Sequence, residues 1–167
     1  QDLHSATGEA VSIALQNDVY MQYIRVIQST HPLRFVTEEG SMRPLTQSAT
    51  GWMLMATHPD KEVERLVRRA NIATPPDQVR QPLELMMQRV REVRTQGWAL
   101  AENIPLLGGA TVCVLLPIAA QGRPVVLGLG GTLERIMPQR EKLLALMKEL
   151  AGQLLVTSQG HPGDSVA

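Results

Sequence analysis

The sequence predicts an α+β domain built on an antiparallel sheet. Stretches with the composition of strands lie near the start of the chain and again over residues 98–131, and three helical stretches separate them. One further helical stretch follows the last strand. A doubly wound parallel sheet would instead require strands and helices to alternate along the chain. With 167 residues, the chain is long enough for one domain with a substantial core.

The first strands are predicted to form a hairpin. Alternating apolar residues in EAVSIALQNDVYMQYIRVIQS flank Asn17 and Asp18, which suit a turn. LRFVTEEG predicts a further strand that ends at Gly40. Pro44 marks a loop, and Ser48 or a neighbouring residue is expected to cap a short helix that follows.

Two longer helices are predicted in the middle of the chain. The first starts near Asp60. The second has Pro82 at or near its first turn, where proline is tolerated, and it ends at Gly97. Apolar residues recur at helical spacing in both, which predicts one buried side for each. They are Val63, Leu66, Val67 and Ala70 in the first helix, and Val79, Leu83, Met86, Val90 and Val93 in the second.

A second hairpin and a terminal helix complete the prediction. WALAEN predicts a short strand, and ATVCVLLPIAA pairs with PVVLGLGG across the turn QGR. The terminal helix has Pro138 in its first turn and an apolar face formed by Leu143, Met147, Leu150 and Leu154. We expect the domain to cover residues 1–157 and the tail, 158–167, to be disordered.

Composition excludes several functional classes. Sixteen basic residues balance sixteen acidic ones, so no overall field attracts nucleic acid or an anionic membrane. Aromatic residues make up 3% of the chain, too few for a base-stacking surface. The single cysteine, together with the lack of a signal peptide or membrane-length apolar run, predicts a cytoplasmic protein. Because the chain begins with Gln1, we expect it to be a piece of a longer protein.

No motif for catalysis, metal binding or cofactor binding is present. The four histidines are isolated and lack the spacing of metal ligands. Cys113 lies in an apolar run, so we expect an inert residue of the core or of a pocket wall. GLGGT is followed by neither the Gly-Lys-Ser/Thr of a phosphate loop nor a dinucleotide fingerprint. We therefore expect no enzymatic activity and no cofactor.

Four small residues predict a hollow in the sheet. Gly128 and Gly130 leave one face of a strand bare, and Thr111 and Cys113 place small polar groups on one face of its neighbour. If these faces coincide, they form a concavity for one small molecule, with TQSATG over its mouth. Free backbone N–H groups at the start of that helix would suit an anion. The alternative, equally compatible with the residues, is that a helix packs against the glycines.

Four stretches of the sequence resemble the effector-binding domain of IclR-type transcriptional regulators. They are TGEAVSIALQNDVYMQYIRVIQS, GSMRPLTQSATGWMLMA, VREVRTQGWALAEN and VCVLLPIAAQGRPVVLGLGGTLERI, which together span about residues 3–155. The resemblance implies a GAF-like fold, a curved antiparallel sheet flanked by helices. It also implies a small-molecule effector, self-association as a dimer or tetramer, and DNA binding only through an N-terminal winged helix-turn-helix domain that is absent from this chain.

The resemblance also implies the position of the effector pocket. Trp52 stands where the family usually has lysine, and two glycines replace serines that bind the effector in some members. The loss of two hydroxyl groups predicts a roomier pocket, better suited to an aromatic acid than to a polar acid of two or three carbons. The implied pocket residues are Ala49, Thr50, Glu102 or its neighbour Ala101, Gly109, Thr111, Cys113, Gly128 and Gly130.

Two other functions are compatible with the sequence. A dimerisation module without a ligand would have side chains covering the glycines, and an enzyme would use the same pocket. We expect Gly128→Leu to abolish an effector response while leaving the fold mostly intact.

Overall fold

The computed structural model describes residues 1–159 of the chain. Its last helix continues to Gln159, two residues beyond the predicted end of the domain. The rest of the predicted tail, residues 160–167, lies outside the described part.

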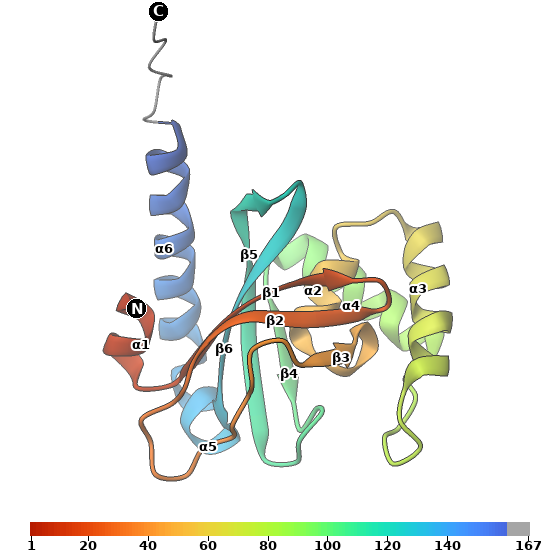
Figure 1. The fold of residues 1–167 in the computed structure, drawn as a ribbon, viewed down its shortest axis with the longest axis horizontal. Helices are drawn as coiled ribbons and strands as arrows, with labels where there is room; N and C mark the ends of the chain where they lie inside the picture. The colour runs from red at the N-terminus through yellow and green to blue at the C-terminus, as the bar shows by residue number, and fades with distance from the viewer. Residues whose placement is uncertain (160–167) are drawn as a thin grey trace, which may run out of the picture.

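A curved six-stranded sheet forms the centre of the domain (Figure 1). The strand order is β3-β2-β1-β6-β5-β4, and every neighbouring pair is antiparallel. This confirms the predicted α+β class with a curved antiparallel sheet flanked by helices. The strands are β1 (Ala10–Asn17), β2 (Tyr20–Ile27), β3 (Met42–Pro44), β4 (Ala99–Glu102), β5 (Gly109–Ala120) and β6 (Arg123–Thr132).

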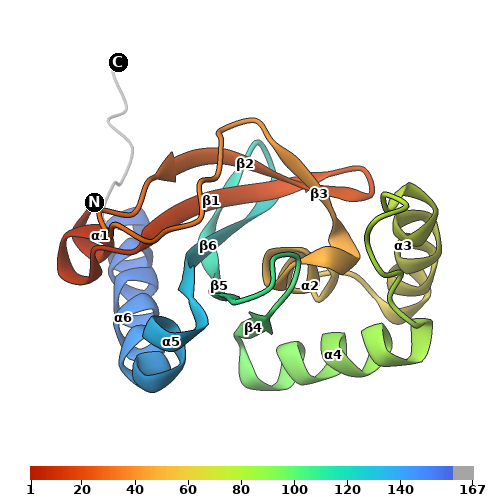
Figure 2. The same cartoon turned by 90° about the horizontal axis from the view of Figure 1, so that it is seen from below.

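Helices cover both faces of the sheet (Figure 2). One face packs against α2, α3 and α4 around a core that includes Met21, Trp52 and Met86. The other packs against α1, α5 and α6 around Leu129 and Leu143. The helices are α1 (Asp2–Thr7), α2 (Ala49–Met55), α3 (Asp60–Ala73), α4 (Leu83–Gln96), α5 (Leu133–Ile136) and α6 (Arg140–Gln159), with 3-10 turns η1 (Leu45–Gln47) and η2 (Met137–Gln139).

Both predicted hairpins are confirmed, and both turn where the sequence indicates. β1 and β2 are joined through Asp18, which adopts a positive φ of 54°. β5 and β6 are joined through Gln121 and Gly122, with φ values of 52° and 76°. Asp and Gly tolerate this left-handed conformation, and here the hairpin twist requires it.

The predicted strand LRFVTEEG does not form. Its apolar residues Leu33 and Val36 are 73% and 65% exposed, so burial of their side chains does not stabilise a strand here. The place beside β2 is taken by the short strand β3 instead. The Glu39 carboxylate accepts a hydrogen bond from the Val26 backbone N–H, at 3.0 Å, so a side chain replaces a sheet bond there.

Two helix predictions need correction at their ends. Val79 was predicted on the buried side of α4, but it precedes the helix and is 78% exposed, whereas Pro82 adjoins the first turn as predicted. Pro138 lies in the 3-10 turn η2 instead of in α6. On α6, the predicted apolar face is buried at Leu143 and becomes exposed at Leu154, where the helix extends beyond the sheet (Figure 1).

Candidate functional site

The register of the sheet brings the predicted small residues onto one face. In the β5–β6 pair, Thr111 lies opposite Gly130 and Cys113 lies opposite Gly128. β1 continues the same face, because Ser12 lies opposite Gly128. The concave face is therefore lined by hydroxyls, a thiol and bare backbone.

Helix α2 closes one part of this face. The Ser48 hydroxyl caps the helix by accepting a hydrogen bond from the Gly51 backbone N–H at 2.9 Å, as predicted. A Cβ added at Gly128 would lie 2.9 Å from Ser12 Oγ and 3.7 Å from Thr50 Oγ1. The second alternative, a helix packed against a glycine, therefore holds at Gly128.

The other part of the face remains open as a cleft of about 70 Å³. Its floor includes Thr111, Gly130 and Gly109, and Thr50 of α2 forms part of its wall. The first alternative, a concavity floored by backbone, therefore holds at Gly130. The remaining wall comes from β2, β3 and three connecting segments, and it includes Tyr23, Phe35, Thr37, Arg43, Ser48 and Ile104–Leu106.

The other residues that the resemblance implies lie outside this cleft. Ala49 and Cys113 are buried in the core beside α2. Ala101 lies opposite Thr111 in the β4–β5 pair and is buried as well. Glu102 is exposed and lines a separate groove beside α4.

The Cys113 thiol is part of the core. Complete burial raises its pKa to about 12, and only the backbone of Ala99 and the side chain of Thr50 offset that shift. A thiol that stays protonated is neither a nucleophile nor a metal ligand. Of the two expectations for Cys113, the structure therefore favours inert core.

Arg43 gives the cleft its chemical character. Among the described residues, it is the one charged side chain that lines the cleft, and none of them forms an ion pair with it. The hydroxyls of Ser48 and Thr111 add neutral donors, and the rings of Tyr23 and Phe35 add flat apolar surface. A cation, hydroxyl donors and aromatic walls together suit an organic carboxylate.

Sequence analysis missed Arg43 and both aromatic residues of the cleft. Tyr23 follows the alternation of the first hairpin, which marks it as inward-facing but not as part of a ligand site. Phe35, the only phenylalanine in the chain, lies in a segment that was predicted as a strand. Only the fold shows that this segment lies over Gly109, where an added Cβ would come within 3.2 Å of the Phe35 ring.

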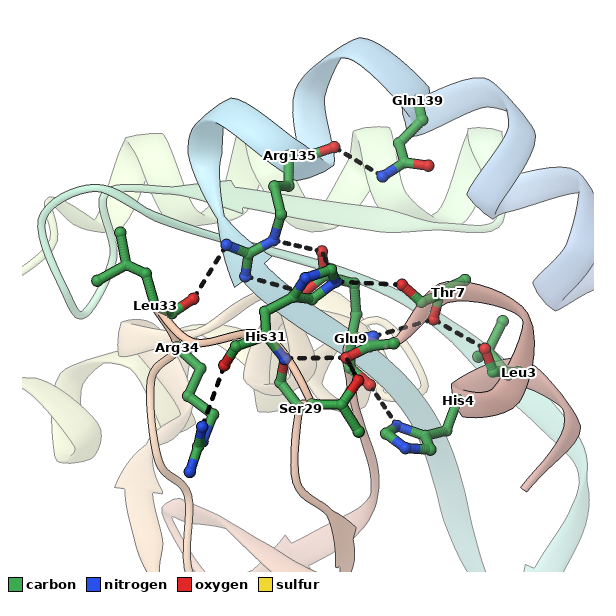
Figure 3. Close-up of polar contacts among 12 residues, drawn as sticks. Leu3, His4, Thr7, Glu9, Ser29, His31, Leu33, Arg34, Arg135 and Gln139 are labelled. Atoms are coloured by element: carbon green, nitrogen blue, oxygen red, sulfur yellow. Dashed lines mark hydrogen bonds and ion pairs between the residues drawn. The ribbon is translucent and has the colours of Figure 1, made fainter.

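A buried ion pair lies near the cleft (Figure 3). The Glu9 side chain is fully buried and accepts hydrogen bonds from Arg135 Nε and Nη2, at 2.7 and 3.1 Å. These bonds raise the pKa of Arg135. Gly131 permits the pair, because a Cβ there would lie 2.4 Å from Glu9 Oε2.

Two searches of residues 1–159 define what else the domain carries. No group of three or more His, Cys, Asp and Glu side chains in that range is placed to hold a metal ion. No helix within it is both long and apolar enough to cross a membrane.

The sequence matches, over residues 1–155, the family described as bacterial transcriptional regulator IclR C-terminal. The structure is similar to the effector domain of a transcriptional regulator named IclR from Acinetobacter sp. ADP1, with 51% sequence identity and a TM-score of 0.88. That similarity covers 92% of this chain and 90% of the other.

More distant structures share the fold. The IclR protein of Thermotoga maritima is 21% identical, with a TM-score of 0.71, and the match covers 92% of this chain and 64% of that one. An IclR-family regulator from Brucella abortus is 19% identical, with a TM-score of 0.77, and the match covers 94% and 59%. A comparison with curated proteins finds no match.

Proposed function

The chain belongs to the family of the C-terminal domains of IclR-type bacterial transcriptional regulators, and from this membership we propose that it is a regulatory domain that binds an organic acid in the cleft. The family is one of transcriptional regulators rather than enzymes. The ligand we propose is a small aromatic monocarboxylic acid.

Arg43 carries this proposal. Its guanidinium group lies in a concave site with the hydroxyls of Ser48 and Thr111, and no described residue neutralises its charge by ion pairing. Arginine binds carboxylates through two parallel hydrogen bonds, which fixes orientation as well as charge. A carboxylate at this position would pair the cation and use the hydroxyl donors.

The aromatic part of the proposal depends on Tyr23 and Phe35. These two rings line the cleft in a chain with only five aromatic residues. The free volume of about 70 Å³ is smaller than the roughly 150 Å³ of an engineered cavity that holds benzene. Binding of a ring therefore requires the segment that carries Phe35 to move outwards.

The regulatory part of the proposal follows from family membership. A ligand changes the activity of a regulator only if it binds one arrangement of the protein better than another. We propose a cytoplasmic protein that self-associates as a dimer or tetramer and contacts DNA through an N-terminal domain. The balance of sixteen basic and sixteen acidic residues supports DNA contact outside this domain.

Calorimetric titration with a matched panel of compounds tests the ligand class. The panel contains benzoate, its uncharged counterpart benzamide, and acetate. We expect benzoate to bind, and benzamide to bind at least about tenfold more weakly, since a hydrogen bond to a charged group contributes about 1.5–3 kcal/mol. Arg43→Gln should weaken benzoate binding by a similar factor.

Arg123→Gln is the control for the loss of one positive charge, because Arg123 is exposed at the β5–β6 turn and lies outside the cleft. Binding of acetate but not benzoate would contradict the aromatic proposal. Equal affinity for benzoate and benzamide would contradict the role of Arg43. No binding by any of the three would favour a dimerisation module without a ligand.

A further inference from the structure

The segment 28–39 contacts both the cleft and the buried ion pair. Phe35 and Thr37 of this segment line the cleft. Within the same segment, the Leu33 carbonyl accepts a hydrogen bond from Arg135 Nη1 at 3.0 Å, and His31 Nε2 lies 3.5 Å from Glu9 Oε1. The residues that contact the pair, His31 and Leu33, are thus only a few positions from Phe35 and Thr37, which line the cleft.

The Glu9–Arg135 pair is a firm attachment point for this segment. Glu9 is completely buried, and the two oxygens of its carboxylate are held by two nitrogens of one guanidinium group. Arg135 uses its third nitrogen for Leu33. Loss of one partner of a buried pair leaves a charge without compensation, so such a pair opens rarely.

The same end of the segment is bonded to the N-terminal helix. The Gly8 carbonyl, just after α1, accepts hydrogen bonds from Ser29 Oγ and the Thr30 backbone N–H, both at 2.9 Å. His31 Nε2 lies 3.3 Å from the Thr7 carbonyl oxygen. These contacts lie beside the ion pair (Figure 3). A shift of residues 29–33 would therefore displace the C-terminal end of α1 as well.

The remainder of the segment is held more weakly. It forms no strand, and its side-chain links are exposed: Gln28 bonds the Thr37 backbone within the segment, and Glu39 contacts the Val26 N–H and Arg25 of β2. Segments with few buried contacts and exposed hydrogen bonds open locally at low free-energy cost. The position of the part over the cleft therefore depends on the firm attachment of residues 29–33.

We propose that Glu9 and Arg135 are positioning residues, which hold segment 28–39 over the cleft and thereby set access to the ligand site. Outward movement of Phe35 on ligand entry shifts His31 and Leu33 relative to the ion pair. The contacts of this end of the segment with Thr7 and Gly8 transmit the shift to α1. The ligand part of this inference rests on the proposed function. The positioning part does not, because Phe35 lies over Gly109 and lines the cleft together with Thr111 in the structure itself.

A thiol introduced at the floor of the cleft tests the positioning role without any ligand. In Thr111→Cys, the rate of alkylation by iodoacetamide reports access to the cleft. We expect Glu9→Gln in this background to raise that rate about tenfold, and His31→Ala to raise it by a smaller factor. Glu64→Gln is the matched control, because it removes the same charge from an exposed pair with Arg68 on α3.

Cys113 separates local opening from unfolding in the same experiment. It is fully buried beside α2, so it reacts only if the core opens. Peptide mass spectrometry should find position 111 labelled and Cys113 unlabelled in both variants. If Glu9→Gln fails to fold, the alkylation rate of the His31→Ala variant tests the proposal instead. This variant leaves the Glu9–Arg135 pair intact and removes the contacts of the His31 side chain with Glu9 and the Thr7 carbonyl.

Rates within twofold of the Thr111→Cys parent in the folded variants would overturn the proposal, as would equal labelling of Cys113. Benzoate adds the ligand arm: at saturation it should slow alkylation at position 111 in the parent, and less so in Glu9→Gln. If benzoate does not bind the wild-type domain, the proposed ligand class is wrong. The alkylation rates without ligand still test the positioning role of Glu9 and Arg135.

Discussion

The two faces of β6 at its C-terminal end use glycine for different reasons. Gly130 borders the cleft, where the nearest atom to an added Cβ would be Thr111 Oγ1 at 3.3 Å. A Cβ on its neighbour Gly131 would point to the opposite face and meet Glu9 Oε2 at 2.4 Å. The first glycine keeps space open beside the cleft, and the second makes room for a carboxylate that is already present.

The comparison shows that the absence of a side chain has no single meaning in this strand. Gly128 adds a third case, since a Cβ there would contact Ser12 of β1 and Thr50 of α2. A run of glycines in a sequence therefore predicts close approach of something, but not whether that partner is a helix, an ion pair or a ligand.

Gly131→Ala should have the largest effect on stability. The new methyl group would displace the Glu9 carboxylate from Arg135, and it would lie 3.2 Å from Ile136 Cδ1. Because Glu9 is fully buried, its separation from Arg135 should lower the free energy of unfolding by about 3 kcal/mol or more. Urea unfolding followed by circular dichroism measures this change.

Gly130→Ala is the control for the loss of a glycine in the same strand. We expect a change of at most about 1 kcal/mol, because the closest side chain, Thr111, borders open space and can turn away. Equal destabilisation by both substitutions would contradict the assignment of different roles to the two glycines.

Gly128→Leu should come next in its effect on stability. The sequence predicts that this change spares the fold, but the structure leaves no room for a leucine side chain between Ser12 and Thr50. Overpacking of this kind costs about 1–3 kcal/mol. We therefore expect a lower urea midpoint, and a variant as stable as wild type would show that the face below α2 is open.

The fold was predictable because its elements carry local signals. The alternation around Asn17 and Asp18 predicts the first hairpin, and Ser48 predicts the start of α2. Residues two apart share a face of a strand, so the predicted pairing of β5 and β6 allowed Thr111 and Gly130 to share one face, and the register of the sheet places them opposite each other. Each of these inferences needs only neighbours in the sequence.

The ion pair and the charged wall of the cleft were not predictable in the same way. Glu9 and Arg135 are 126 residues apart, and nothing near either residue indicates a buried partner. Arg43 reaches the cleft because residues around Pro44, which were predicted as a loop, form the short strand β3 beside β2. These features depend on long-range packing, which periodicity does not encode.

Alkylation of Cys113 in the wild-type domain compares the closed part of the concave face with the open part. Burial raises the pKa of its thiol to about 12, so the reactive thiolate remains scarce up to pH 9. We expect almost no reaction with iodoacetamide between pH 7 and 9, whereas an ordinary thiol with a pKa of about 8.5 reacts increasingly over that range. Rapid, pH-dependent labelling in the folded protein would place Cys113 in an accessible pocket.

The exposed pair of Asp60 with Arg94 should have the smallest effect on stability, and it provides a contrast with the buried Glu9–Arg135 pair. The hydrogen bond from Arg94, which also bonds the Ala56 and His58 carbonyls, lowers the pKa of Asp60. A folded-state pKa below the unfolded value of about 3.9 stabilises the domain above that pH, and this contribution disappears as the pH falls through the folded value. Asp60→Asn should therefore lower stability slightly at pH 7 and not at all at the lowest pH where the domain stays folded.

Salt separates this surface effect from a buried one. Exposed charges are screened within a few ångströms at molar salt, so the difference between wild type and Asp60→Asn at pH 7 should shrink when salt is added. The Gly131→Ala defect should persist under the same conditions, because water and ions do not reach the Glu9 carboxylate. Parallel urea titrations of both variants at low and high salt measure the two responses. A Gly131→Ala defect that salt removes would mean that the Glu9–Arg135 pair is open to solvent.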